Sequence, residues 1–594
     1  MNEYYKAKLD QVNSDQYQKD ALNSIDSTVV LAGPGSGKTT VLTLKIMNLL
    51  DGYIKEPRGL ACITYSREAA REFEERLVKC GFTKRKNVFL GTVHSFCLSE
   101  IIRPFSDIYD LGVPKDYAIV SEKESKEIFE EAKKEKKLDY KYEEMNKERN
   151  LCIDGTSSVE HSLNSDLIDL AECYEKKLFD KGLIDFDSII ISSVKAIQGN
   201  SYIRRCLSSK YEWLIIDEYQ DLGHPLHEMV LSLYEMTGIK IFAVGDSDQS
   251  IYGFSGANPE YLLELSRKSG IKKINLINNY RSNQDIIKGS EIVLNEIRNY
   301  VAKTRNGENA RYEFYGCTNG DEDQFEFVST TLVSKYHSEK IPYDEIAILV
   351  SRNGQCKELA KKLKKNNIPC YISKHDFKVT DFVKWLIDCS KYVSGDKTML
   401  SELFAFWHSL PFVKETLNDD NDVISEKKRL MRILDSSKIM ANDVEGWVKY
   451  IINQSKLDEH LLHSTDYPDE LDNLNALCKE LKTDAYSDFN VSMFGKIGKP
   501  TNQVTISTRH SSKGLEFEAV IMCGMEEGHF PGWQSKKDKE KEKEEDRLCF
   551  VCVSRAKKIC TLIYSQKFYE GRDKHLNTYS PSKYYIALKK EFGK

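Results

Sequence analysis

The sequence predicts an α/β protein with two parallel sheets, each interrupted by a mainly helical insertion. Short apolar runs rich in β-branched residues recur along the 594-residue chain, and most are followed by a loop and a helical pattern. This alternation is typical of strands that are buried in parallel sheets. We expect strands at Thr28–Ala32, Leu60–Thr64, Trp213–Ile216, Ile241–Val244, Ile274–Leu276, Ile346–Val350, Val504–Ser507, Val520–Cys523 and Thr561–Tyr564.

Two long segments interrupt the alternation without ending it. Residues 101–199 are rich in Glu, Lys and Asp, and Ser121–Lys137 has the pattern of an exposed helix. Residues 378–496 are also helical in pattern and carry three of the five tryptophans. Because 594 residues are too many for one hydrophobic core, we expect both segments to be inserted domains. Residues 1–100 and 200–277 then form the first α/β domain, and residues 278–377 and 497–594 form the second.

The composition excludes a broadly cationic protein. The net charge is −6 and the pI is about 6.2, so any nucleic acid must bind in a local groove. The N-terminus lacks the apolar stretch of a signal peptide, and no run of 18 apolar residues occurs, so we expect a cytoplasmic protein without a membrane partner. Most of the 15 cysteines lie in apolar stretches, and Cys549 and Cys552 have no second ligand pair nearby, so we expect reduced thiols rather than a metal site.

A glycine-rich loop follows the first expected strand. The segment GPGSGKTT precedes a helical pattern, so strand, loop and helix come in the order of a P-loop. Glycines let the backbone wrap a phosphate, and the helix N-terminus adds a favourable field. We expect Lys38 to reach the β and γ phosphates of ATP and Thr39 to hold Mg²⁺. The predicted nucleotide-binding residues of the loop are Gly33, Pro34, Gly35, Ser36, Gly37, Lys38, Thr39 and Thr40.

Two adjacent carboxylates end another expected strand. Asp217 and Glu218 directly follow the apolar run Leu214–Ile216. In a chain that also has a P-loop, this position indicates the second half of a nucleotide site. We expect Asp217 to hold Mg²⁺ through water and Glu218 to orient and deprotonate the attacking water.

Further blocks of sequence follow one another in a fixed order between residues 12 and 556. They are Val12–Gln16, Ile63–Ala70, Gly91–Phe96, Asp217–Asp221, Val244–Phe254, Asn279–Ser282, His510–Phe517 and Arg547–Ala556. In this order the blocks resemble the motifs of the UvrD/Rep family of superfamily 1 DNA helicases, over nearly the whole chain. The resemblance implies two RecA-like P-loop NTPase domains, 1A and 2A, with helical insertions 1B and 2B.

The resemblance implies a nucleotide site that is shared between the two α/β domains. Arginines neutralise the charge that phosphoryl transfer places on the γ-phosphate oxygens. Arg281 and Arg555 would reach that phosphate from the second domain, while Gln249 would sense it from the first. The family pattern further assigns Gln16 and Tyr280 to the adenine and Glu516 to the ribose. Hydrolysis would then let the domains part and would convert chemistry into motion.

The resemblance also implies single-stranded DNA as the track. Non-specific binding of a single strand needs aromatic faces for the bases and donors for the phosphates. Tyr65, Tyr252 and Phe254 occupy positions where the family stacks bases. The family pattern also implies DNA contacts for Thr92, His94, Ser95 and His510. Movement would run 3′→5′, so a 3′-tailed duplex is the expected substrate.

Three functions remain open at this point. The first is an autonomous helicase. The second is a DNA-stimulated ATPase subunit that serves a nuclease or another repair or antiphage defence protein, as Gabija-type systems contain; the shortened second insertion motivates it. The third is a binding scaffold with a dead ATPase. It is disfavoured because Lys38, Asp217, Glu218, Gln249, Arg281 and Arg555 are all present.

Overall fold

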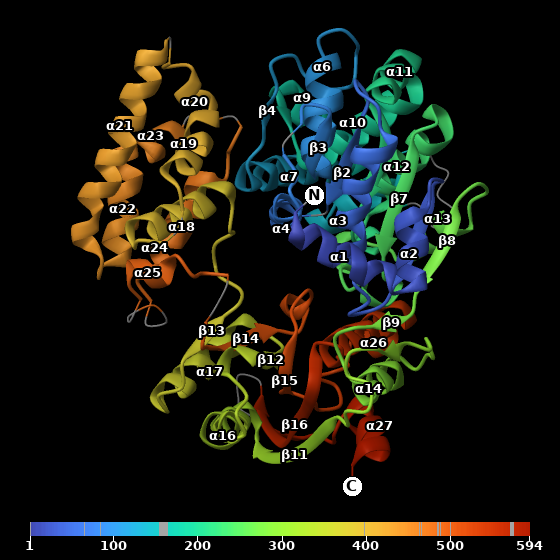
Figure 1. Ribbon diagram of the computed structural model, residues 1–594, viewed down its shortest axis with the longest axis vertical. Helices are drawn as coiled ribbons and strands as arrows, with labels where there is room; N and C mark the ends of the chain where they lie inside the picture. Colours follow the sequence, from blue (N-terminus) through green and yellow to red (C-terminus); the bar gives the residue numbers. More distant parts are fainter. Residues whose placement is uncertain are drawn as a thin grey trace.

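A computed structural model describes residues 2–64, 66–83, 85–153, 164–396, 398–417, 419–462, 464, 466–483, 486, 489–498, 501–570 and 575–593. Figure 1 shows two α/β lobes, one above the other at the right and centre, and a separate group of helices at the upper left. The chain passes from the first lobe to the second near residue 278. The helix group, α18–α25, is inserted within the second lobe (Figure 1).

The first lobe is built on a six-stranded parallel sheet with the order β3-β2-β6-β7-β1-β8. Its inner strands are apolar along most of their length because helices cover both faces, whereas the edge strand β8 alternates buried and exposed residues. Two large clusters of buried apolar side chains lie on the two sides of the sheet. The strands are β1 Thr28–Ala32, β2 Gly59–Thr64, β3 Val88–Thr92, β6 Tyr211–Ile216, β7 Lys240–Gly245 and β8 Lys272–Leu276.

Helices of the first lobe connect these strands, and the C-terminal ends of the strands lie along one edge of the sheet. The strands β6, β7 and β1 are neighbours, so the loops that follow them meet at that edge, where open α/β sheets bind ligands. The helices are α1 Glu3–Asn13, α2 Gln16–Asn23, α3 Lys38–Asn48, α4 Arg67–Lys79, α5 Val93–Cys97, α10 Phe186–Gly199, α11 Ser201–Lys210, α12 His224–Thr237 and α13 Glu260–Arg267.

The first insertion has a small core of its own. Helices α7, α8 and α9 contribute buried side chains to it, including Ile128, Met145 and Leu170. The predicted helix Ser121–Lys137 is observed as α7, which buries one apolar stripe and exposes the rest. By contrast, α10 packs into the core of the first sheet. The elements are α6 Arg103–Phe105, β4 Ala118–Ile119, α7 Glu122–Lys136, α8 Tyr142–Leu151, α9 Ser165–Asp180 and β5 Leu183–Ile184.

The second lobe repeats the parallel arrangement. Its sheet has the order β11-β16-β15-β12-β14-β13, and β17 pairs with β16 in the antiparallel direction. Again, apolar clusters lie on two sides of the sheet. The strands are β11 Arg311–Asn319, β12 Ile346–Val350, β13 Cys370–Ile372, β14 Val504–Thr508, β15 Phe517–Met522, β16 Ala556–Glu570 and β17 His575–Thr578, with β9 Asn278–Asn279 and β10 Val301–Ala302 as a separate pair. The helices are α14 Gln284–Leu294, α15 Gly320–Phe327, α16 Val333–Ser338, α17 Asn353–Lys365, α26 Lys539–Val553 and α27 Lys583–Phe592.

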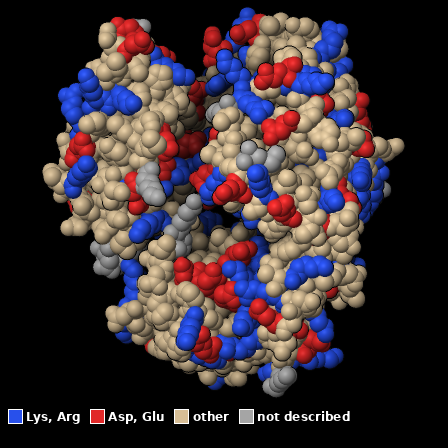
Figure 2. All heavy atoms as spheres, in the orientation of Figure 1, with Lys and Arg blue, Asp and Glu red and all other residues tan. Residues whose placement is uncertain are grey.

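The second insertion is helical and has a core that includes three tryptophans, Trp385, Trp407 and Trp447. Polar contacts join it to the first lobe: Arg71 donates to the carbonyl of Val379, and Arg103 pairs with Asp466. Figure 2 shows a furrow between the two bodies and both signs of charge interspersed on this face. The helices are α18 Asp381–Val393, α19 Leu400–Ser409, α20 Pro411–Lys414, α21 Asp420–Ser437, α22 Val444–Ser455, α23 Leu457–Leu462, α24 Glu470–Leu481 and α25 Val491–Phe494.

The predicted fold class is confirmed: two parallel α/β sheets, each with a mainly helical insertion. Each of the nine expected strands coincides with an observed one, although β16 is much longer than the predicted Thr561–Tyr564. The predicted domain boundaries stay a prediction. All the cysteines are free thiols. Within the described ranges, the helices lack the combination of length and apolar content that crossing a bilayer requires.

Candidate active site and nucleic-acid interface

The P-loop connects β1 to α3. Gly35 and Gly37 have φ angles of +66° and +80°, a left-handed conformation that side chains disfavour, so the turn depends on glycine at these two positions. The Lys38 Nζ atom donates to the carbonyl of Ala32 at 3.1 Å and lies 4.0 Å from a carboxylate oxygen of Asp246. The Lys38 side chain therefore folds back over the loop, and its charge faces Asp246 at the end of β7.

The members of the loop differ in their surroundings. The Ser36 hydroxyl donates to the carbonyl of Gly33 at 2.7 Å, and the carbonyl of Pro34 accepts from a second-lobe side chain. Thr39 lies in the first turn of α3. Thr40 lines a cavity of about 50 Å³ between α1, α3 and α4, so the structure also assigns this residue a place away from the loop.

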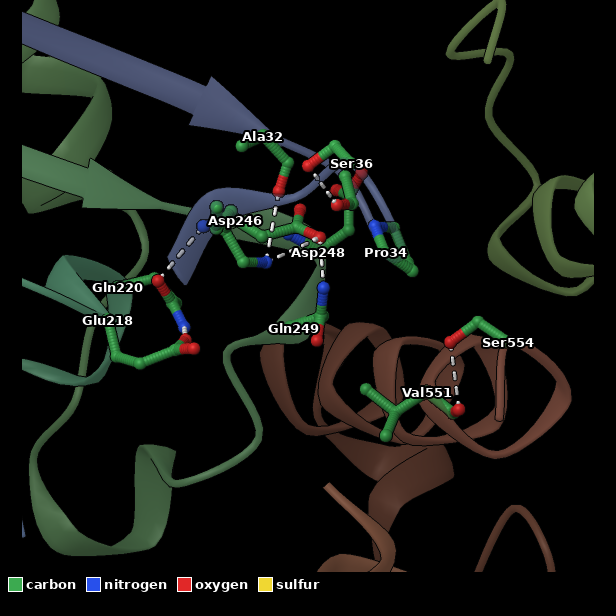
Figure 3. Close-up of polar contacts among 12 residues, drawn as sticks. Ala32, Pro34, Ser36, Glu218, Gln220, Asp246, Asp248, Gln249, Val551 and Ser554 are labelled. Carbon is green, nitrogen blue, oxygen red and sulfur yellow. Dashed lines mark hydrogen bonds and ion pairs between the residues drawn. The ribbon is translucent and has the colours of Figure 1, made fainter. Parts of the chain in front are cut away.

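Asp217 and Glu218 follow β6 at the same edge of the sheet. Glu218 has φ 52°, a left-handed conformation that is uncommon for a side chain of this kind and is found where surrounding contacts enforce it. The Gln220 amide donates to the Glu218 carboxylate, while its oxygen accepts from the backbone N–H of Asp246 at 2.9 Å. Figure 3 shows Gln220 between these two residues. Gln220 thus fixes Glu218 against the loop that follows β7.

The two neighbouring carboxyl groups have opposite pKa shifts. Burial and the adjacent Glu218 raise the pKa of Asp217 to about 7. Burial also raises the pKa of Glu218, but the charges of Lys38 and Lys513 outweigh this effect, so its pKa lies below the ordinary value. Glu218 is therefore ionised at neutral pH, as a general base must be.

Gln249 joins the two lobes at the nucleotide site. Its amide nitrogen donates to Asp246, and its side-chain oxygen accepts from the Arg555 guanidinium at 3.2 Å. Figure 3 shows Gln249 extending from the Asp246 loop toward the end of α26. A continuous polar chain therefore runs from Lys38 through Asp246 and Gln249 to Arg555 of the second lobe.

Arg555 is buried and held by several hydrogen bonds. It is only 1% exposed, and its guanidinium also donates to the carbonyls of Val551 at 3.0 Å and Leu515 at 3.2 Å. Burial, and then the nearby Arg281, lower the pKa of Arg555 to about 9, which leaves it protonated at neutral pH. The structure thus holds a fixed positive charge at the interface.

Arg281 lies beside the P-loop. A methyl group added at Gly35 would lie 2.6 Å from the Arg281 Cβ atom. The Arg281 guanidinium pairs with Glu516 at 2.6 Å, and Asn279 donates to the carbonyl of Pro34 at 2.8 Å. The structure therefore places Arg281 beside the P-loop, with Glu516 next to it. Arg555 is linked to Lys38 of the loop through Gln249 and Asp246.

The structure does not bring Gln16 to the P-loop. The side chain of Gln16 is exposed and bonds to Asp20 one turn along α2. Gln18 is 2% exposed instead, and its amide nitrogen donates to the carbonyl of Ser36 at 2.7 Å. Residues two positions apart on a helix face different directions, so only one of the two glutamines can face the loop. In the structure, Gln18 and not Gln16 contacts the P-loop.

Lys513 is a cross-lobe residue for which the motif resemblance gave no role. Its Nζ atom donates to both carboxylate oxygens of Asp221, at 2.8 Å and 2.6 Å, and to the carbonyl of Gln249 at 2.7 Å. It also lies 5.1 Å from the centre of the Tyr252 ring. A lysine within the block His510–Phe517 was visible in the sequence, but its partners are distant in the chain.

A row of three rings, those of Tyr252, Phe254 and His510, runs from the first lobe to the second. Phe254 is 72% exposed, and its ring centre lies 6.0 Å from that of Tyr252 and 6.2 Å from that of His510. Exposed aromatic faces of this kind suit the stacking of nucleic-acid bases. The structure therefore brings together three of the predicted DNA-binding residues.

The remaining predicted DNA contacts lie at the start of α5. Thr92 caps this helix, and the Ser95 hydroxyl donates to its carbonyl at 2.7 Å. Burial, and then Arg67, lower the pKa of His94 to about 4, so its imidazole is neutral. Phe186, which sequence reasoning missed, packs edge-to-face on His94 at 5.2 Å and is 43% exposed. Tyr65 lies outside the described residues.

Fold and site together define a two-lobed P-loop protein in which side chains of both lobes meet beside the loop. Two family models match the chain in sequence order. The UvrD/REP helicase N-terminal domain matches residues 14–269, and the UvrD-like helicase C-terminal domain matches residues 274–402 and 413–567. The chain belongs to the UvrD/Rep helicase family, which confirms the resemblance.

Curated relatives match over nearly the whole chain. The ATP-dependent DNA helicase PcrA of Staphylococcus aureus is 24% identical over 94% of this chain and 84% of its own length. The ATP-dependent DNA helicase Rep of Buchnera aphidicola is 26% identical over 91% of this chain and 92% of its own length. The PcrA helicase of Staphylococcus epidermidis is 24% identical over 92% of this chain and 82% of its own length.

Proposed function

We propose that this chain is an ATP-dependent DNA helicase or translocase that moves 3′→5′ on single-stranded DNA. The observation that carries the proposal is the polar chain from Lys38 through Gln249 to Arg555, because it couples the P-loop of one lobe to a buried cation of the other. A nucleotide bound at this seam would hold the lobes together, and its hydrolysis would release them. The polarity rests on the family.

The chemistry follows from where charge develops. In phosphoryl transfer, negative charge spreads over the γ-phosphate oxygens and the bridging oxygen. Lys38 supplies one positive charge from the P-loop, while Arg281 and Arg555 supply two from the second lobe. Glu218, ionised and fixed by Gln220, accepts the proton of the attacking water. Donors that are fixed before the reaction need no reorganisation during it.

The residues at the site fit a magnesium ion. Magnesium is commonly bound by one or two carboxylates, with phosphate oxygens and water as further ligands. Asp217 and the Thr39 hydroxyl supply oxygen ligands of this type, and the raised pKa of Asp217 shows a buried carboxyl group that a nearby cation would stabilise as the anion. When bound, the ion would neutralise charge on the β and γ phosphates.

Gln18 supports ATP as the nucleotide. Its side-chain oxygen is buried and has no hydrogen-bond partner among the residues that the structure describes, while its amide nitrogen donates to the carbonyl of Ser36. A buried acceptor without a donor is costly, so a ligand that donates to it gains affinity. The exocyclic amino group of adenine is such a donor, whereas guanine presents a carbonyl at that position. Tyr280 offers a ring as the second wall of the base site.

Gln18→Ala is expected to raise the KM for ATP about tenfold, since one buried hydrogen bond is lost. Steady-state ATP hydrolysis with single-stranded DNA measures this. The matched control is Gln16→Ala, which removes the same side chain from the exposed side of α2. A larger effect of Gln16→Ala than of Gln18→Ala would return the base-reading role to Gln16.

Phe254→Ala is expected to weaken the binding of a single-stranded oligonucleotide about tenfold, because one stacking platform for a base is lost. Fluorescence anisotropy with a labelled oligonucleotide measures the affinity. The control is Phe179→Ala, which removes an equally large ring that is 50% exposed on α9, away from the row of rings. Equal affinities of wild type and Phe254→Ala would reject this surface as the DNA track.

Strand displacement tests the proposed function as a whole. The isolated chain is expected to separate a 3′-tailed duplex when ATP is present, and to leave a 5′-tailed duplex paired. Hydrolysis without displacement on either substrate would reject autonomous unwinding and favour the second candidate, a DNA-stimulated ATPase subunit that serves a nuclease or another repair or defence partner. Exposed polar contacts, such as the Arg103–Asp466 ion pair, join the second insertion to the first lobe. A partner protein can displace contacts of this kind, and this observation favours the second candidate.

A further inference from the structure

We propose that Asp15 is a positioning residue that sets base specificity by holding both walls of the base site, an inference that rests on the proposed function. Asp15 is 4% exposed, and each of its two carboxylate oxygens accepts two hydrogen bonds. Its side chain receives hydrogen bonds from two backbone N–H groups of the first lobe and from two side chains of the second lobe. One carboxylate therefore links the two elements that face the base.

The first carboxylate oxygen fixes the helix that carries Gln18. It accepts from the backbone N–H of Tyr17 at 2.8 Å and of Gln18 at 3.3 Å, which makes Asp15 the N-cap of α2. An N-cap satisfies donors that the first turn of a helix cannot pair internally. The cap thereby fixes where α2 begins and which way the Gln18 side chain leaves it, toward the carbonyl of Ser36.

The second carboxylate oxygen fixes the ring of Tyr280. It accepts from the Tyr280 hydroxyl at 2.5 Å and from the Asn278 amide at 2.9 Å. The backbone N–H of Tyr280 also donates to the carbonyl of Gly35 at 2.8 Å, so the residue is held at both ends. Hydrogen bonds to a carboxylate are roughly twice as strong as neutral ones. Burial raises the pKa of Asp15, but the four hydrogen bonds, with that from Tyr280 the largest, together hold it below the ordinary value.

A carboxylate is the group that this arrangement requires. Four donors converge on the side chain, and an ionised carboxylate has about four acceptor positions and no donor of its own. Asparagine at this position would keep the helix cap, but its NH₂ group would face the Asn278 amide and the Tyr280 hydroxyl. Gln18, which would contact the edge of the base, belongs to the first lobe, and Tyr280, whose ring would form one wall, belongs to the second. The base site is therefore complete only while Asp15 holds the two lobes in contact.

The test compares the binding of ATPγS and GTPγS by isothermal titration to wild type, Asp15→Asn and Tyr280→Phe. Wild type is expected to prefer the adenine nucleotide. Asp15→Asn is expected to reduce that preference about tenfold, since charged hydrogen bonds to a buried group are lost. Tyr280→Phe, which keeps the ring and the helix cap, is expected to reduce it in the same direction, and the double variant is expected to add little to Asp15→Asn.

The control is Asp419→Asn, the same change at the N-cap of α21, where the carboxylate accepts from Asp422 at 2.9 Å. It is expected to leave the preference unchanged. The role of Asp15 would be overturned if Asp15→Asn and Tyr280→Phe both kept the adenine preference of the wild type while Gln18→Ala lowered it. If Asp15→Asn does not fold, Tyr280→Phe decides. Because binding is measured without turnover, a wild type that discriminates between the nucleotides but does not hydrolyse ATP would reject the proposed function and not this inference.

Discussion

Arg555→Ala is expected to lower DNA-stimulated ATP hydrolysis about a thousandfold, the scale of removing an arginine that stabilises phosphoryl transfer. The affinity for ATP is expected to change only a few fold, because the charge on the γ-phosphate grows mainly in the transition state. Arg555 is protonated at neutral pH, and its hydrogen bonds to Val551, Leu515 and Gln249 hold the guanidinium group between the two lobes. Initial rates and nucleotide binding, measured on the same preparation, separate the two effects.

Two variants accompany this measurement. Arg555→Lys keeps the charge but lacks the fork that bonds to several partners at once, so an intermediate rate is expected. Arg305→Ala removes an arginine of the same lobe that pairs with Glu518, and it is expected to leave the rate unchanged. If Arg555→Ala lost ATP affinity and rate to the same extent, the arginine would act in binding and not in the transition state.

Lys38→Ala is expected to reduce ATP hydrolysis at least a hundredfold, the cost of removing one fixed charge from a water-excluded site. Lys38 is the first-lobe cation that faces Asp246, and its charge also lowers the pKa values of Asp217 and Glu218. Without it, triphosphate would approach several carboxylates uncompensated. Affinity for single-stranded DNA is expected to remain within about twofold, because the exposed rings lie on another surface. Undiminished hydrolysis would reject the phosphate-site assignment.

The frame of the fold was accessible from the sequence because parallel strands leave continuous apolar runs. The run before Gly33 and the run before Asp217 both end at the edge where the site lies, so strand ends predicted its location. Strand lengths were less accessible. The run Thr561–Tyr564 marks only the apolar middle of β16, whose C-terminal end pairs with β17 and carries polar residues that no apolar pattern reveals.

Side-chain direction was the part of the site that the motifs did not determine. Gln16 and Gln18 lie two positions apart, and a motif resemblance alone cannot decide which one faces the loop. The structure decides it through the cap at Asp15, which sets the start of α2. Lys513 and Phe186 were missed for a related reason: their partners Asp221 and His94 are far away in the chain and meet them only in the folded protein.

The most direct test of the shared site is the affinity for a transition-state mimic, ADP with aluminium fluoride and magnesium, relative to ADP alone. A group that acts on the developing charge must favour the mimic over the product. Wild type is expected to bind the mimic at least a hundredfold more tightly than ADP, and Arg555→Ala is expected to lose most of that preference while ADP affinity stays the same. A full preference in Arg555→Ala would contradict the account, since Arg555 would then contribute nothing to the reacting phosphate.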